Sequence, residues 1–165
     1  MARRAFYSFH YLPDNWRAST VRNIGTVEGN RPASDNDWES ITSAGDAEIK
    51  RWIADQMNGR SCTVVLVGTN TANRKWINYE IVESWNGGMG VVGIRIHGLK
   101  NSEGNISTMG NNPFDYITYG ATKKVLSTTV KCYNPTGSNS QERYAWIQEH
   151  LANAVEEAIR IRGKN

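Results

Sequence analysis

The stretch that most constrains the fold is "SCTVVLVG", residues 61–68. It is apolar at every position from Val64 to Val67, and most of these residues are β-branched, which favours a strand. A half-exposed strand would alternate apolar and polar residues, whereas an unbroken apolar run is typical of a strand buried on both faces. We therefore expect this segment inside a parallel sheet that is covered on both sides.

Candidate strands and helices alternate along the rest of the chain. Strands are expected at residues 4–11, 61–68, 91–98 and 124–133, and a short one in the long loop at 28–46. Helical patterns separate most of them. The order predicts an α/β fold: a flavodoxin-like three-layer sandwich with a central parallel sheet of about five strands. A single domain, 1–165, suits this length and the 39% of apolar residues.

Local signals predict where the helices begin and end. Pro13 and Asp14 break the first strand before a helix at 15–25, and Asp46 and Gly59 mark the two ends of a second helix. Thr71 or Asn73 can cap a third helix, which runs to about Asn86. Ser138 and Gln141 have the spacing of a capping box and open the last helix. In a parallel sheet of this kind, ligands bind beyond the carboxyl ends of the strands. The expected ends are residues 8–11, 68–71 and 97–98.

The charge pattern argues against a nucleic-acid partner. The chain has 19 lysines and arginines and a net charge of +3, which is only mildly basic. Nucleic-acid binding needs a clustered basic stripe, whereas here the basic residues are scattered. The adjacent basic pairs are Arg3–Arg4, Lys50–Arg51, Arg74–Lys75 and Lys123–Lys124. A phosphate-bearing small molecule would need only one or two of these residues.

No segment predicts an export signal, a membrane span or a metal site. The start "MARRAFYSFHY" lacks a long apolar region, and no apolar run approaches the length of a membrane span. We expect a soluble, cytoplasmic protein without a membrane partner. Cys62 and Cys132 lie in apolar contexts, and their spacing suggests neither a disulfide framework nor a zinc site.

Familiar catalytic motifs are absent or misplaced. "GMGVVG", residues 88–93, matches a dinucleotide-binding pattern by its letters, but it follows a helix and opens a strand, the reverse of what that fold requires. A phospho-receiver needs paired acids after the first strand, where this chain has "SFHY". Of the three histidines, His10 stands at a strand end where it could line a site; His97 and His150 are more simply structural.

The helix in "NTANRKWINYEIVESW", residues 70–85, places a glutamate at the edge of its apolar face. At 100° per residue, that face carries Ile77, Ile81, Ser84 and Trp85. Glu80 is expected on its flank, half-buried; Trp76 lies one turn earlier toward the rim, and Glu83 points to solvent. A half-buried carboxylate beside an indole could meet a cation, but a boundary glutamate paired with Arg74 or Lys50 fits the spacing as well.

Several motifs together resemble one known family. "AFYSFHY", "TVRN", "CTVVLVGTNTANRKWINYEI" and "NPFDY" are similar to the TIR-like proteins of the Thoeris type, which act in bacterial anti-phage defence. The resemblance runs from Arg4 to about Tyr116 and is weaker in the last strand and helix. The Trp-x-x-x-Glu pair formed by Trp76 and Glu80 is also similar to the catalytic helix of NAD-consuming TIR domains. Arg22 and Asn23 match the first-helix motif without an assigned role.

The resemblance implies an enzyme with NAD as its substrate and no further cofactor. It implies that Glu80 is catalytic and that Ser8, Phe9, His10 and Trp76 contribute to the substrate pocket. The loop at 28–46 would correspond to a loop beside the TIR active site, with Trp38 as a stacking residue. In Thoeris-type members, nicotinamide is released and a cyclic ADP-ribose-type signal acts on a separate effector. Chains would form a homo-oligomer on activation.

One carboxylate is compatible with this chemistry. Nicotinamide in NAD already carries a positive charge and leaves as a neutral base, so no general acid is needed, unlike in most glycosidases. One ionised glutamate can stabilise the oxocarbenium-like ribose. Two other hypotheses stay open: a non-catalytic TIR scaffold and a nucleotide-binding sensor. Neither has a use for a half-buried acid at this position.

Overall fold

The computed structural model describes residues 2–30 and 41–165. The elements follow one another in the order β1 (Ala5–Phe9), α1 (Tyr11–Arg22), α3 (Asp46–Met57), β2 (Cys62–Val67), α4 (Lys75–Asn86), β3 (Gly90–Arg95), β4 (Thr118–Tyr119), β5 (Lys124–Val125), β6 (Cys132–Tyr133) and α5 (Ser140–Gly163), with short 3-10 helices η1 (Pro113–Tyr116) and η2 (Leu126–Thr128). None of the described helices is long and apolar enough to cross a membrane.

Four parallel strands form the main sheet, in the order β1-β2-β3-β6. The α/β prediction is confirmed, with four strands in place of about five. Of the loop at 28–46, where a short strand was expected, the described residues show a parallel bridge between Arg4 and Glu28 beside β1, and residues 31–40 lie outside the description. When the Glu28 segment is counted as a strand beside β1, the strands lie in the chain order second, first, third, fourth, fifth, which is the strand order of a flavodoxin-like sheet.

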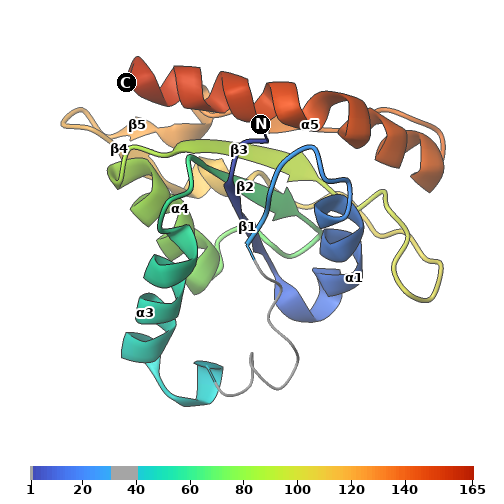
Figure 1. Cartoon of the computed structure of the whole chain (residues 1–165), viewed down its shortest axis with the longest axis horizontal. Coiled ribbons are helices and arrows are strands. Elements are labelled where there is room, and N and C mark those ends of the chain that lie inside the picture. The colour runs from blue at the N-terminus through green and yellow to red at the C-terminus, as the bar shows by residue number, and fades with distance from the viewer. Residues whose placement is uncertain (1, 31–40) are drawn as a thin grey trace.

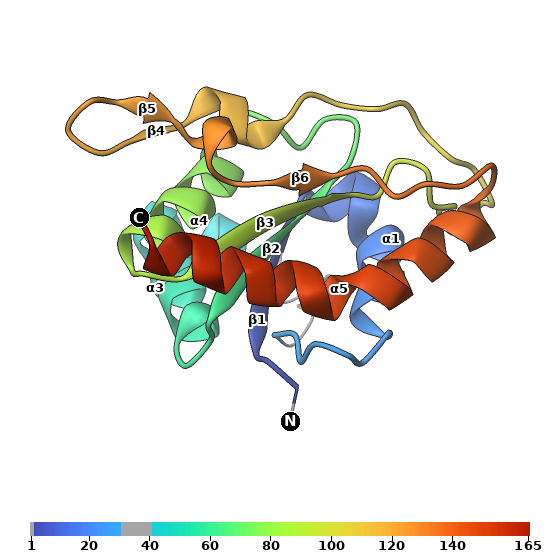
Figure 2. The same ribbon diagram turned by 90° about the horizontal axis from the view of Figure 1, so that it is seen from above.

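Strand β2 is buried at all six positions, as its apolar run predicts. Its side chains alternate between two cores: Cys62, Val64 and Leu66 pack with α1 and α5, while Val65 and Val67 pack with α4. Helix α3 joins the α4 side through a cluster around Phe6. Figures 1 and 2 show α5 along one side of the sheet and α4 on the other. These are the three layers of the predicted sandwich.

The strand expected at 124–133 is interrupted. Its first two residues pair with β4 in a separate antiparallel hairpin, and only Cys132 and Tyr133 reach the main sheet. Leu126 and Val130, which seemed to extend the strand, are instead buried in the cluster that covers α4. The apolar residues of this segment therefore fold over a helix, so the chain between them turns.

Two predicted helix starts are wrong. Helix α1 begins at Tyr11, four residues early, and Pro13 lies in its first turn, where its missing N–H is tolerated. Helix α4 begins at Lys75 with Arg74 as its N-cap and no side-chain cap. Thr71 is not a cap, because its hydroxyl accepts a hydrogen bond from the Gly68 N–H at 2.8 Å.

The caps of the other two helices differ from the predictions by one residue. Gly45, and not Asp46, is the N-cap of α3. In α5, Asn139 caps the helix by accepting a hydrogen bond from the Glu142 N–H, and the Glu142 carboxylate accepts one from the Ser138 hydroxyl at 2.8 Å. This is not the predicted capping box, because the Glu142 carboxylate accepts from Ser138, the residue before the N-cap, and not from the N-cap Asn139.

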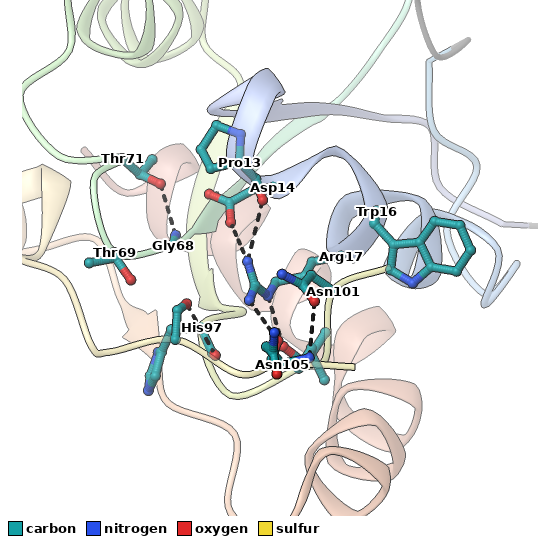
Figure 3. Close-up of polar contacts among 12 residues, drawn as sticks. Pro13, Asp14, Trp16, Arg17, Gly68, Thr69, Thr71, His97, Asn101 and Asn105 are labelled. Carbon is teal, nitrogen blue, oxygen red and sulfur yellow. Dashed lines mark hydrogen bonds and ion pairs between the residues drawn. The ribbon is translucent and has the colours of Figure 1, made fainter. Parts of the chain in front are cut away.

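A buried ion pair fixes the start of α1 against the carboxyl edge of the sheet (Figure 3). Arg17 donates from Nη1 to Asp14 Oδ1 at 3.1 Å, from Nε to the Leu99 carbonyl at 2.8 Å and from Nη2 to the Asn105 carbonyl at 3.0 Å. The exposed fractions of Asp14 and Arg17 are 2% and 4%. A Cβ at Gly68 would collide with the Asp14 carboxylate, so the residue directly after β2, where α1 approaches, is a glycine.

Replacing Arg17 by leucine should destabilise the fold by about 3 kcal/mol, because it leaves the Asp14 carboxylate buried and unpaired. Urea denaturation at pH 7 measures the loss. Adding Asp14→Asn removes the stranded charge and should recover part of the stability. If the double variant were as unstable as Arg17→Leu alone, the loss would come from the contacts with Leu99 and Asn105 and not from charge.

Candidate active site

Helix α4 carries the candidate catalytic residue. Its buried face holds Ile77, Ile81, Ser84 and Trp85, as the helical spacing predicts, and Glu83 is exposed. The helix follows β2, so its first turn stands at the carboxyl edge of the sheet. Glu80 lies one and a half turns into the helix, on the side that faces β1.

Glu80 is buried more deeply than the sequence indicates. Its exposed fraction is 8%, where a half-buried side chain was expected. The reason is α3, which packs beside it and supplies Ile49, Trp52 and Ile53 to the same pocket. Ser8, fully buried on β1, donates a hydrogen bond to Glu80 Oε1 at 3.1 Å.

Within the described residues Glu80 has no cationic partner. Neither of the basic residues considered from the sequence pairs with it: the Lys50 ammonium lies over the Tyr79 ring, 5.5 Å from its centroid, and Arg74 forms no ion pair there. Burial raises the pKa of Glu80 to about 8, while the hydrogen bond from Ser8 opposes that rise. The carboxyl is therefore mostly protonated at pH 7, and an approaching cation would favour its ionised form.

An aromatic pocket opens on the α3 side of Glu80. Six aromatic residues line it: Phe6, Tyr7 and Phe9 of β1, Tyr11 of α1, Trp52 of α3 and Trp76 of α4. Arg22 and Asn30 close its far end. Its volume is about 40 Å³, so it is narrow, and the aromatic side chains around it offer surfaces against which a flat ring could pack once they move apart.

A second, basic pocket of about 370 Å³ lies on the other side of Glu80, where α1 and α4 begin. It shares four residues with the aromatic pocket, namely Phe9, Tyr11, Trp76 and Glu80. Its other lining residues include His10, Arg74 and Lys75. Burial lowers the pKa of His10, and the Arg74 charge lowers it further, which favours the neutral imidazole. Glu80 thus stands at the junction of an apolar compartment and a positively charged one.

The structure brings most of the predicted site residues together. Phe9 and Trp76 line both pockets and His10 lines the basic one. Ser8 contacts Glu80 and lines neither pocket, which makes it a positioning residue in this arrangement. Trp38 lies outside the described residues. The roles of these side chains toward a substrate stay predictions.

Sequence reasoning missed Tyr11, Trp52 and Arg74. Trp52 was placed among the apolar positions of its helix, and nothing local reveals that its ring lines a pocket formed with β1 and α4. Arg74 belongs to one of the four adjacent basic pairs, which is a weak signal by itself.

Arg22 and Asn23, which match the first-helix motif of the family, lie at the end of α1. Arg22 ends α1, lies 6.0 Å from the centroid of the Tyr7 ring and donates a hydrogen bond to the Asn30 carbonyl. Asn23 is the C-cap of α1. Arg22 therefore lines the far end of the aromatic pocket with a guanidinium that is already engaged.

Comparison with known proteins places this site in a family. The sequence model described as "Thoeris protein ThsB, TIR-like domain" matches residues 6–101, more than half of the chain. The chain belongs to the ThsB TIR-like family. A Bacillus cereus (strain MSX-D12) protein, named as a candidate cyclic ADP-D-ribose synthase, ThsB1, is 40% identical over 124 residues. The alignment covers 72% of this chain and 65% of that relative, so the chain spans slightly less than two thirds of its length.

The part of the chain matched to the ThsB family contains the whole site. It begins at Phe6 on β1, includes α1, α3, β2, α4 and β3, and ends at Asn101 in the loop after β3. The hairpin of β4 and β5, the strand β6 and helix α5 lie outside it. The resemblance seen in the sequence extends further, to about Tyr116, so its motif "NPFDY" lies outside the matched part.

Glu80→Gln should make the protein more stable than wild type at alkaline pH. The native pKa of about 8 lies above the ordinary value of 4.5, so the native state keeps a proton that the unfolded state loses. Stability from this carboxyl is fully present below pH 4.5 and is lost as the pH rises through 8. Thermal unfolding at pH 5 and pH 9 measures the stability difference between the two proteins, which should grow by about 4 kcal/mol between these pH values.

Glu83→Gln is the matched control, because Glu83 is exposed on the same helix. Its stability difference from wild type should be small and should not depend on pH. An equal pH dependence in both variants would place the perturbed carboxyl elsewhere.

Proposed function

We propose that this protein cleaves NAD at Glu80, releases nicotinamide and closes the remaining ADP-ribose into a cyclic signal nucleotide. The observation that carries this proposal is Glu80 itself, a buried carboxyl without a cationic partner among the described residues at the junction of an aromatic and a basic pocket. The name of the Bacillus cereus relative supports the same activity.

The leaving group explains why one carboxyl suffices. When the bond between nicotinamide and ribose breaks, its electron pair stays with nicotinamide, which departs neutral, and positive charge develops on the ribose. The cationic nicotinamide ring also lowers the pKa of Glu80 on binding, because an opposite charge favours the ionised carboxylate. The substrate therefore supplies the cation that Glu80 lacks, and the ionised form is present where charge develops.

The fate of the ribose cation depends on which nucleophile is nearest. Water would give ADP-ribose, whereas a nitrogen of the substrate's own adenine or a ribose hydroxyl would close a ring and release one proton overall. An aromatic lining disfavours water at the ribose, and an adenine that folds back onto the ribose would then be favoured as the nucleophile through proximity. The signal would then act on a separate effector protein, and activation would involve a homo-oligomer.

A non-catalytic scaffold is the weaker hypothesis. Burying an ionisable group without a counter-charge destabilises a fold, and an interaction module gains nothing from it. The same applies to a plain nucleotide sensor, which could bind phosphate and base without Glu80.

Glu80→Gln should reduce NAD turnover at least about 1,000-fold, because it keeps the shape of the side chain and removes the charge that stabilises the ribose cation. Purified wild-type, Glu80→Gln and Glu83→Gln proteins are incubated with NAD, with and without phage-infected cell lysate, and the products are separated by liquid chromatography and mass spectrometry. Glu83→Gln should retain wild-type turnover.

The products distinguish the hypotheses. Nicotinamide with a species one water lighter than ADP-ribose establishes the cyclase, and nicotinamide with ADP-ribose alone establishes a hydrolase. Intact NAD under every condition would favour the scaffold.

The kcat/KM for NAD should rise with pH up to about 8. This parameter follows the free enzyme, in which Glu80 has a pKa of about 8 and must lose its proton to act. Each unit below pH 8 should lower kcat/KM about tenfold, while kcat should be less sensitive because bound NAD lowers the pKa. Steady-state rates between pH 6 and pH 9 test this, and a flat kcat/KM profile would show that a protonated Glu80 is active.

A further inference from the structure

We propose that Arg74 binds the pyrophosphate of the substrate in the basic pocket, so that NAD lies across Glu80 with its nicotinamide in the aromatic pocket. This rests on the proposed function for the identity of the ligand. It assigns a residue that sequence reasoning left without a role, and it fixes the direction in which the substrate enters the site.

Arg74 is the uncommitted cation at this site. Its neighbour Lys75 forms an ion pair with Asp46 at 2.5 Å and lies over the Trp76 ring, so its charge is already balanced. Arg74 has no carboxylate partner among the residues that the structure describes. Its guanidinium nevertheless acts across the pocket, because it lowers the pKa of His10 at the end of β1.

Backbone N–H groups around the basic pocket add to its positive electrostatic potential. Helix α1 begins after His10 and helix α4 begins after Arg74, and neither helix has a side-chain cap. Their first N–H groups carry partial positive charge. The guanidinium adds a full charge and a planar fork of donors, which matches two phosphate oxygens at once.

The spacing between Arg74 and Glu80 suits this substrate. Six residues of helix separate them, which is about 9 Å along the axis. A ribose with its 5′-phosphate covers a comparable length once a hydrogen bond is added at each end. With the scissile carbon at Glu80, the pyrophosphate therefore reaches Arg74, and the nicotinamide ring is directed to the opposite side.

The lining of the aromatic pocket matches the nicotinamide end better than the phosphate end, and at about 40 Å³ the pocket admits the ring only if its side chains move apart. The rings of Phe9, Trp52 and Trp76 offer surfaces for a flat cationic ring. The one arginine there, Arg22, already donates to the Asn30 carbonyl and lies against Tyr7. The reverse orientation would place two negative charges among aromatic side chains and leave Arg74 without a ligand.

The test measures binding of two substrate fragments in a Glu80→Gln background, where no bond is cleaved. ADP-ribose carries the pyrophosphate without nicotinamide, and nicotinamide riboside carries the cationic ring without the pyrophosphate. Isothermal titration calorimetry compares Glu80→Gln alone with the same protein carrying Arg74→Gln, Arg74→Lys, Trp52→Phe or Lys124→Gln. Lys124 is the matched control, an exposed cation on β5 outside the site.

Arg74→Gln should weaken ADP-ribose binding about 10- to 100-fold, because it removes a charge-assisted contact, and should change nicotinamide riboside binding less than about twofold. Arg74→Lys should fall between, because it keeps the charge and loses the fork. Trp52→Phe should weaken nicotinamide riboside and spare ADP-ribose. Lys124→Gln should change neither. Arg74 is exposed and lies outside the core, so its variants should fold normally.

Two results would overturn the inference. Equal ADP-ribose affinity in Arg74→Gln and Lys124→Gln would remove Arg74 from the site. Loss of ADP-ribose binding in Trp52→Phe with full binding in Arg74→Gln would show the reverse orientation. Failure of the proposed function looks different: wild type would leave NAD intact, while Arg74-dependent binding of ADP-ribose would still establish the phosphate subsite.

Discussion

The burial of β2 on both faces is the constraint from which the rest of the architecture follows. All six of its side chains are withdrawn from water, so one helical layer must cover each face of the sheet. Helices α1 and α5 cover one face and α3 and α4 the other. Parallel strands require that α1 and α4 begin at the same edge, where β1 and β2 end. The basic pocket beside Glu80 lies where these two helix starts converge.

The buried carboxyl of Glu80 lowers the stability of the folded protein. Ser8 supplies one hydrogen bond, but the described structure offers no cation to offset the removal of the carboxyl from water. A substrate that arrives with a positive charge changes this balance at the moment of binding. The same burial that destabilises the free protein therefore prepares the carboxyl for a cationic ligand, a conflict commonly found at functional sites.

The sequence predicted the features that depend on local periodicity. Its predictions were wrong where contacts between segments far apart in the chain determine the structure. The run from Val64 to Val67 predicted the covered parallel sheet, and helical spacing predicted which face of α4 is buried. The depth of Glu80 depends on α3, which packs beside it from elsewhere in the chain, so spacing within α4 underestimated it. Thr71 has a side chain that can cap a helix, but its hydroxyl accepts a hydrogen bond from the Gly68 N–H instead. Leu126 favours a strand locally and folds over α4 instead.

The outer edge of β1 has a consequence for how such proteins diversify. Among the described residues, the fifth position of the sheet is held by a single bridge at Glu28, and the Asn30 side-chain amide, in place of a neighbouring strand, accepts the hydrogen bond of the Tyr7 N–H at 2.9 Å. A full strand would tie every residue on this edge to one register. Here the edge borders the aromatic pocket through Asn30, so a substitution at Asn30 can reshape the pocket without shifting the sheet. Relatives could thus inherit one scaffold and evolve different chemical signals.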